Sequence, residues 1–294
     1  MKKVVCKRIR FVFLAFLLAQ TSCIVRHRQI PLDQRMLPAK TASKEDLFRG
    51  LQERSNQIRT LLGSVTMDIS GGGKQTGVLT EYRQTSGYVF VDRPNNIRIK
   101  ALAPLVLSTV LDMVSDGREY RISVPVKNWW MEGDVNVRIN SKNPIADLRP
   151  KDFLDGLFVD VNPYLNKPQI KRTFTEQTEG RRSFYVFTFF DVSGESPEAR
   201  TLEKVWIDRS DDLEVSRKQM FREDGRMEAD VEYSNYHSEA GVKFPEIVQI
   251  YRPIEDLTLK LTFLTTKINE PLQDNTFVLD RPEGSELLQT QTAQ

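Results

Sequence analysis

Few residues of this 294-residue sequence are suited to catalysis. It has two histidines, His27 and His237, and two cysteines, Cys6 and Cys23. These four are not spaced as zinc ligands or as a Cys/His pair. The "GGGK" run at 71–74 lacks the earlier glycine and the following Ser or Thr of a phosphate-binding loop. Adjacent carboxylates fall in predicted turns, where solvated acids are common. We therefore predict no catalytic residue, no metal and no cofactor, and a protein that is not an enzyme.

The chemistry that the sequence favours is modification of the Cys23 thiol. The stretch 8–23 reads "RIRFVFLAFLLAQTSC", with further basic residues before it. Its apolar run, 11–19, is about half of the roughly 20 residues that cross a bilayer. A basic start, a short apolar run and small residues predict a cleaved export signal over 1–22.

The last four residues of this stretch, 20–23, resemble the lipobox of bacterial lipoprotein signals. The resemblance implies that Cys23 becomes the N-terminus and carries a diacylglyceryl thioether, usually with a third acyl chain. Two or more chains anchor a protein stably to a membrane. An ordinary secretory signal with an incidental cysteine is the alternative.

Removal of the leader changes the charge balance. The whole chain has 42 basic and 40 acidic residues, and five of the basic residues lie in the leader. The mature chain is therefore slightly acidic, at −3, which argues against a strongly basic nucleic-acid surface. Cys6 also lies in the leader, so the mature chain has no disulfide and depends on its hydrophobic core.

Two helical segments are expected in the mature chain. After a tether at 23–42, Ser43 is a suitable N-cap for an amphipathic helix that Gly63 would end. The second segment is 147–158, where Pro150 suits a first helical turn. These are the only candidates to cover an open apolar sheet face.

Between and after these helices the apolar residues alternate with polar ones. This period of two predicts strands over 64–70, 76–84, 87–94, 96–104, 108–133 (a hairpin turning at Asp116-Gly117), 182–190, 202–210, 213–221, 226–236, 244–251 and 257–266. The pattern predicts a mainly β fold, an open antiparallel β-barrel of about 11 strands with helical lid segments. We assign this domain to 43–285 and expect a disordered tail at 286–294.

Two segments resemble the LolA/LolB-type lipoprotein carriers. Residues 93–125 show an "RP" turn, a strand, a Pro-Leu turn, a strand, "SDG" and a strand ending in Pro. Near the C-terminus, Phe277, Pro282 and Gly284 match the family's closing segment. The resemblance implies an unclosed barrel that holds lipid under helical lids.

The candidate site residues follow from this alternation and this resemblance. The turn 104–107 carries three large aliphatic residues where turns are usually polar, and the resemblance implies that Leu105 enters a membrane during transfer. The turn consists of Pro104, Leu105, Val106 and Leu107. The acyl-chain cavity is expected to be lined by Ile97, Ile99, Ile122, Val124, Phe153, Phe158, Val205, Ile207, Leu259 and Leu261.

The expected function is that of a membrane-anchored periplasmic lipoprotein that binds acyl chains of lipoproteins or related amphiphiles, in lipoprotein localisation to the outer membrane. Its partners would be a lipid or lipidated protein, the membrane through its acyl anchor, and a soluble periplasmic carrier. Ile24 rather than Asp follows Cys23, which favours the periplasmic face of the outer membrane. Two alternatives stay open: a structural envelope lipoprotein with a filled barrel, and an envelope hydrolase whose acid or serine is not identified.

Overall fold

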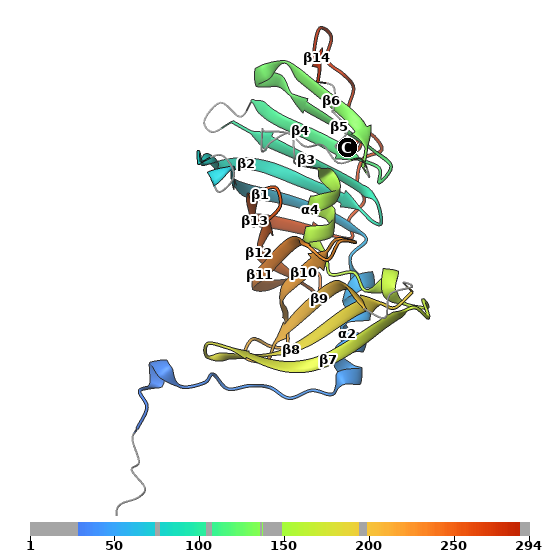
Figure 1. The fold of residues 1–294 in the computed structure, drawn as a ribbon. Helices are drawn as coiled ribbons and strands as arrows, with labels where there is room; N and C mark the ends of the chain where they lie inside the picture. The colour runs from blue at the N-terminus through green and yellow to red at the C-terminus, as the bar shows by residue number, and fades with distance from the viewer. Residues whose placement is uncertain are drawn as a thin grey trace, which may run out of the picture. The chain divides into compact units, whose positions relative to one another are not determined.

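The structure is a computed structural model that describes residues 29–73, 77–103, 108–135, 137, 149–193 and 199–288 (Figure 1). The chain separates into two units, Met1–Leu37 and Pro38–Gln294. The described part of the first unit contains a short 3-10 helix, η2 (Leu32–Gln34). The second unit contains the sheet and its helices. Among the described residues, no helix has the length and apolar character needed to span a bilayer.

One sheet of fourteen strands dominates the second unit, and all of its described pairings are antiparallel except that of β14 with β6. The strand order is β14-β6-β5-β4-β3-β2-β1-β13-β12-β11-β10-β9-β8-β7. In the described chain the sheet ends at β7 and β14 and does not close, which confirms the predicted open, mainly β fold. The strands are β1 (Thr60–Gly71), β2 (Thr80–Asp92), β3 (Asn96–Leu102), β4 (Thr109–Ser115), β5 (Glu119–Val124), β6 (Trp129–Asp134), β7 (Ile170–Glu179), β8 (Arg182–Asp191), β9 (Arg200–Asp208), β10 (Val215–Phe221), β11 (Met227–Glu239), β12 (Val242–Arg252), β13 (Leu257–Ile268) and β14 (Glu286–Leu287).

Strand β7 has no counterpart among the expected strands. It is an edge strand with mostly exposed side chains, and its sequence "IKRTFTEQTE" carries little apolar alternation. Its inward residue Phe174 packs on Tyr185 and Phe187 of β8. Cross-strand aromatic packing of this kind is invisible to a local pattern.

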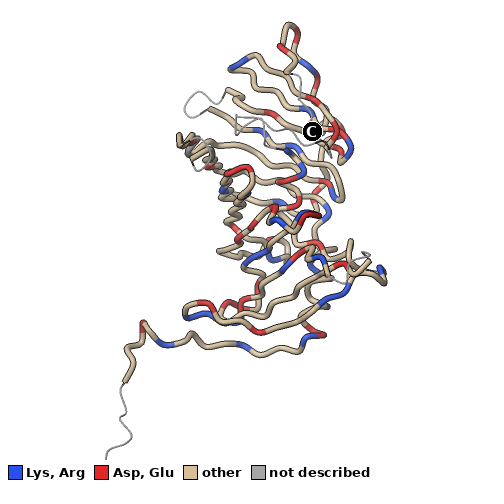
Figure 2. Tube along the Cα trace, viewed as in Figure 1, with Lys and Arg blue, Asp and Glu red and all other residues tan. Residues whose placement is uncertain are grey.

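The described α-helices are α2 (Lys44–Gln57) and α4 (Pro150–Leu157), which lie on the same face of the sheet, here called the inner face (Figure 1). Two more 3-10 helices, η3 (Pro125–Lys127) and η4 (Asn162–Tyr164), follow β5 and α4. The inner face carries the main hydrophobic cluster, to which nearly every long strand contributes alternate residues. Strand β3 is typical, since Ile97, Ile99 and Ala101 are buried and the residues between them are partly exposed. Figure 2 shows acidic and basic residues interleaved along the trace rather than gathered by sign.

The first helix begins as predicted but ends earlier. The Ser43 hydroxyl accepts a hydrogen bond from the Asp46 amide at 3.1 Å, which confirms the N-cap. The helix ends at Gln57, whose carbonyl accepts a bond from the Asn269 side chain at 2.7 Å. Gly63 lies within β1, and the prediction that it ends the helix is wrong. A Cβ at Gly63 would lie 2.6 Å from the Phe263 ring, so this strand position requires a glycine for packing.

The second helix and the predicted hairpin turn at Asp116-Gly117 are confirmed. Pro150 occupies the first turn of α4, as expected. The hairpin of β4 and β5 turns at Asp116-Gly117, where the Asp116 carboxylate accepts bonds from the amides of Arg118 and Glu119. Gly117 has φ of 86°, a conformation that glycine adopts at little cost.

Residues on both sides of the predicted domain, 43–285, form backbone hydrogen bonds with it. Lys40, from the expected tether, exchanges two hydrogen bonds with Arg209, one of them from the Lys40 amide to the Arg209 carbonyl at 2.8 Å. At the other end, Glu286 and Leu288 donate their amides to the carbonyls of Asn128 and Trp130. Backbone hydrogen bonds therefore hold residues assigned to the tether and to the tail.

Candidate functional site

All ten residues expected to line an acyl-chain cavity are buried in the hydrophobic cluster of the inner face. They are Ile97, Ile99, Ile122, Val124, Phe153, Phe158, Val205, Ile207, Leu259 and Leu261, and none is more than 9% exposed. They come from β3, β5, β9, β13 and the segment of α4. Their period-two or helical spacing placed each one correctly on the buried side.

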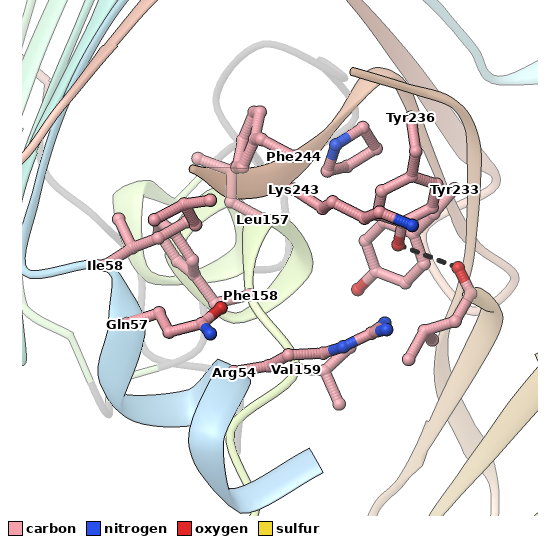
Figure 3. A pocket seen from close by; sticks show the side chains of 13 residues that line it. Arg54, Gln57, Ile58, Leu157, Phe158, Val159, Tyr233, Tyr236, Lys243 and Phe244 are labelled. Carbon is pink, nitrogen blue, oxygen red and sulfur yellow. Dashed lines mark hydrogen bonds between the residues drawn. The ribbon is translucent and has the colours of Figure 1, made fainter. Parts of the chain in front are cut away.

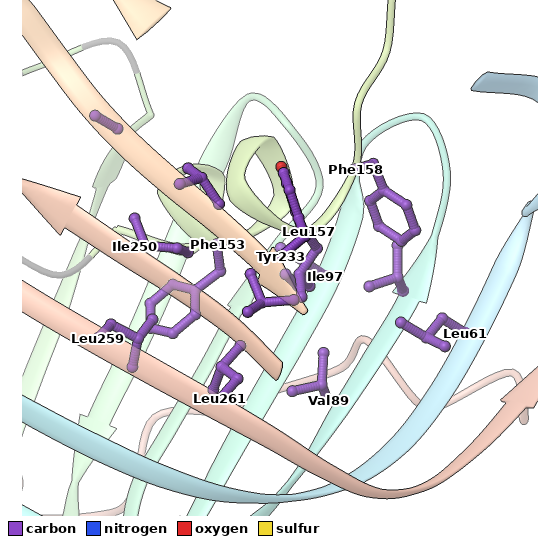
Figure 4. Packing of buried hydrophobic residues seen from close by; sticks show 14 of the residues in the cluster. Leu61, Val89, Ile97, Phe153, Leu157, Phe158, Tyr233, Ile250, Leu259 and Leu261 are labelled. Carbon is purple, nitrogen blue, oxygen red and sulfur yellow. The ribbon is translucent and has the colours of Figure 1, made fainter. Parts of the chain in front are cut away.

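In this structure α4 occupies the middle of the inner face. Phe153 and Leu157 point from the helix toward the sheet, among Ile97, Ile250 and Leu259 (Figure 4). The helix backbone also comes close to the sheet, because a Cβ at Gly156 would lie 2.3 Å from Cδ1 of Ile250. The inner face is thus covered by the chain's own side chains where α4 lies.

Among the described residues, two cavities with mainly apolar walls lie beside α2. One of about 190 Å³ lies between α2 and the β9–β10 connection, lined by Ala42, Asp46, Leu47, Gly50, Leu51, Arg54, Ile207 and Leu213. The other, of about 50 Å³, lies where α2, α4 and β10–β12 meet, and Arg54, Phe158, Tyr233 and Phe244 are among its lining residues (Figure 3). Arg54 lines both cavities, and its guanidinium forms an ion pair with Glu214 at 2.7 Å.

A larger recess of about 620 Å³ has a different character. It is formed by the end of α2, the start of β1 and the segment 269–277. Its lining includes Asn56, Arg59, Asp92 and Glu270. These polar groups stand beside Pro271, Leu272 and Phe277, so the recess is more polar than the cavities beside α2 and suits an acyl chain less well.

Arg93 connects both helices to the sheet. It follows β2, and its guanidinium donates to the carbonyls of Ser55 and Ile58 at the end of α2. It also forms an ion pair with Asp160, just after α4, and lies 5.1 Å from the centre of the Phe158 ring. The last carbonyls of a helix lack intrahelical partners, so Arg93 satisfies the end of α2 and fixes the segment after α4.

Two side chains from the sheet hold the C-terminal end of α4. The Lys218 ammonium donates to the carbonyls of Asp155 and Phe158, the second at 2.7 Å. The Tyr233 hydroxyl donates to the carbonyl of Gly156 at 2.8 Å. Lys218 and Tyr233 are both almost fully buried.

A buried carboxyl group lies on the same face. Glu203 accepts a hydrogen bond from the Tyr164 hydroxyl at 3.1 Å. Burial raises the pKa of Glu203 to about 7, although the Lys218 charge and the Tyr164 hydrogen bond act in the opposite direction. Burial and the Glu203 charge raise the pKa of Tyr164, which therefore remains a hydrogen-bond donor.

Ion pairs secure the other end of α4. Asp152, in its first turn, pairs with Arg149 at 2.8 Å and with Arg252 at the end of β12. Arg252 also pairs with Glu255 at 2.9 Å. The helix is therefore held by charged groups at its start and by polar donors at its end.

Cys23 and the turn formed by Pro104, Leu105, Val106 and Leu107 lie outside the described residues. The pairing of β3 with β4 continues to the edge of that turn, since the Ala103 amide donates to the Ser108 carbonyl at 2.8 Å.

The sequence reading missed the polar part of this site. The sequence places Arg93 in an "RP" turn and predicts no role for Lys218 or Glu203. The sequence does contain one signal for Glu203 and Lys218. Each lies two residues from an apolar residue of the same strand, Glu203 from Val205 and Lys218 from Met220, and therefore on the same face. A charged residue in phase with apolar neighbours points toward the core and needs a partner there.

Comparison with known proteins gives structural likenesses to this sheet. A DUF1329 family protein from Desulfovibrio piger is similar over 79% of this chain and 95% of its own, with 13% identity and a TM-score of 0.53. A putative outer membrane lipoprotein-sorting protein domain from Vibrio parahaemolyticus is similar over 79% of this chain and 94% of its own, with 8% identity and a TM-score of 0.51. A LolA superfamily protein from Nitrosomonas europaea has 10% identity and a TM-score of 0.49, over 81% of this chain and 99% of its own.

No family model and no curated protein sequence matches the chain. The two likenesses with TM-scores above 0.5 extend over most of this chain and nearly all of each neighbour. The protein therefore shares the fold of these two structures, which agrees with the lipoprotein-carrier resemblance of the segments at 93–125 and 277–284.

Proposed function

We propose that this protein is a membrane-anchored periplasmic lipoprotein that binds acyl chains of lipoproteins or related amphiphiles and acts in their localisation to the outer membrane. It makes and breaks no bond. Cys23 carries the lipid anchor, and a soluble periplasmic carrier delivers the cargo. The lipoprotein-sorting name of one structural neighbour and the LolA-like fold support this function.

The observation that carries the proposal is the way the apolar inner face is covered. Two short helices lie over it, and cavities of about 190 and 50 Å³ remain beside α2. Beside the apolar packing of the helices, sheet residues make polar contacts with their ends, such as those of Arg93 and Lys218. Polar end contacts can be exchanged for water, so the described arrangement is a closed form that admits acyl chains when a helix moves.

The packing of α4 favours a second candidate. Phe153 and Leu157 fill the centre of the inner face, as a permanent core would. A structural lipoprotein with a filled barrel would need no lipid cargo. The two candidates differ in whether an acyl chain can enter beside α2.

A substitution at Gly50 tests this difference. Gly50 lies on α2 and lines the 190 Å³ cavity, and a Cβ there would meet no atom within 4 Å. Gly50→Phe therefore fills the cavity with a ring, and Glu53→Phe adds the same ring on the exposed side of the same helix. Both variants are expected to fold, since neither displaces a packed side chain.

The measurement is native mass spectrometry of the purified chain after exposure to a diacyl phospholipid and to a synthetic diacylated peptide. The wild type and Glu53→Phe are expected to bind one or both probes, and Gly50→Phe is expected to lose at least nine-tenths of the bound fraction. No bound probe in the wild type under any condition would favour the filled-barrel candidate.

A further inference from the structure

Lys218 and Tyr233 place strong hydrogen-bond donors within the apolar inner face. Lys218 is 2% exposed and Tyr233 is 5% exposed. They stand on the neighbouring strands β10 and β11, where Lys218 pairs with Val231, so that Tyr233 is its diagonal neighbour on the same face. Their donors bind three carbonyl groups at the end of α4, those of Asp155, Gly156 and Phe158.

A buried ammonium needs acceptors, because an unpaired charge in apolar surroundings is costly. In the closed form the end of α4 supplies them, and the carbonyls in turn need donors because they lack intrahelical partners. The ammonium and the carbonyls therefore satisfy each other only while α4 lies on the sheet. With eight residues, α4 is too short to be stable away from the sheet.

We propose that Lys218 and Tyr233 are the polar recognition site for the ligand, and that they bind the ester or amide carbonyl oxygens at the head end of its acyl chains. These carbonyls replace those of Asp155, Gly156 and Phe158 when α4 leaves the inner face. The inference rests on the proposed function, since it concerns the same ligand.

The surroundings of the two donors favour a neutral acceptor over an anion. Glu203 stands on the inner face of β9, diagonal to Lys218, and places a negative charge beside it when ionised, above about pH 7. A phosphate would be repelled by this carboxylate in its ionised form, whereas a carbonyl oxygen would not. Next to the donors, Val205, Val215 and Phe244 provide apolar surface for the chains themselves.

The test compares a diester phospholipid with the diether phospholipid of identical chains and headgroup. Both probes are titrated into the full mature chain, and binding is followed by displacement of a fluorescent fatty acid. The wild type is expected to bind the diester about 3- to 10-fold more tightly than the diether, as for the loss of one or two net hydrogen bonds. Lys218→Met and Tyr233→Phe are each expected to reduce this ratio to below about twofold.

We compare the ratio of the two affinities because a variant that only loosens α4 changes the affinity for the diester and the diether equally, and so leaves their ratio unchanged. Lys204→Met is the matched control, since Lys204 belongs to the opposite face of β9 and should keep the wild-type ratio. Tyr233→Phe removes only a hydroxyl, so it remains informative if Lys218→Met fails to fold.

Equal affinity of the wild type for the two lipids would overturn the recognition site but leave the proposed function standing. The recognition site would also be overturned if Lys218→Met and Tyr233→Phe both kept the wild-type preference for the diester over the diether. Binding of neither lipid by the wild type would instead remove the proposed function.

Discussion

Arg93 and Asp160 form an ion pair that joins the turn after β2 to the segment after α4. The same guanidinium donates to the carbonyls of Ser55 and Ile58, so one side chain connects the two helices through the sheet. Its side chain is only 12% exposed, and the pair is therefore weakly screened by solvent. Arg93 thus contacts the end of α2 and the segment that follows α4.

Replacing this arginine should loosen the helices. Arg93→Leu leaves the Asp160 carboxylate and the carbonyls at the end of α2 without their partner. We expect a loss of about 2–4 kcal/mol in the free energy of unfolding, the range for breaking a partly buried charged network. Hydrogen exchange should show faster exchange at the end of α2 and after α4.

Arg59→Leu is the control for that variant. Arg59 is 80% exposed and pairs with Asp92 at 3.5 Å, so its loss should cost less than about 1 kcal/mol. Equal exchange rates in Arg93→Leu and Arg59→Leu would contradict the role assigned to Arg93.

The buried Glu203 predicts a pH dependence of stability. Its pKa is about 7 in the folded protein against an ordinary value of 4.5, so the folded state holds the proton more tightly between these values. The free energy of unfolding should therefore fall as pH rises from about 4.5 to 7, by about 3 kcal/mol for this group. Urea titrations at pH 5 and pH 8 measure the difference.

In Glu203→Gln this dependence should largely disappear, since the amide does not titrate. Carboxylates with lowered pKa, such as Asp212, lose their contribution only as pH falls below about 4, outside this window. An identical slope in wild type and variant would show that Glu203 is ionised throughout.

Two helical glycines should respond in opposite ways to alanine. Gly156→Ala places a Cβ within 2.3 Å of Cδ1 of Ile250, so either the Ile250 side chain or α4 must shift, at a cost of about 1–3 kcal/mol. Gly50→Ala meets no neighbour and should stabilise α2 by about 0.5–1 kcal/mol. Thermal unfolding shows whether each variant is more or less stable than the wild type. If Gly50→Ala is destabilised, the space beside Gly50 is smaller than described.

Leu105→Glu tests the proposed membrane contact of the turn at 104–107. The charge should prevent insertion of this turn, since burial of one leucine contributes about 1.5–3 kcal/mol and a carboxylate reverses that gain. Transfer of a lipidated protein to liposomes is expected to fall several-fold with no change in the unfolding temperature. Unchanged transfer would exclude membrane insertion of Leu105.

The local spacing of residues was sufficient for much of the fold. Alternation at Ile97 and Ile99, the Asp116-Gly117 turn and the Ser43 cap each specify a local conformation through neighbours a few residues away. The two segments that resemble the LolA/LolB-type carriers also implied an unclosed barrel, and the strand order of the described sheet confirms the open form.

The tertiary structure decided where the helices end and what they touch. The end of α2 is set by Asn269 and Arg93, which lie far from it in the sequence. The position of α4 depends on Lys218 and Tyr233, whose roles appear only when β10 and β11 are paired beneath it. Contacts between distant residues leave no local period in a sequence, and for this reason the apolar wall of the site could be predicted while its polar attachments could not.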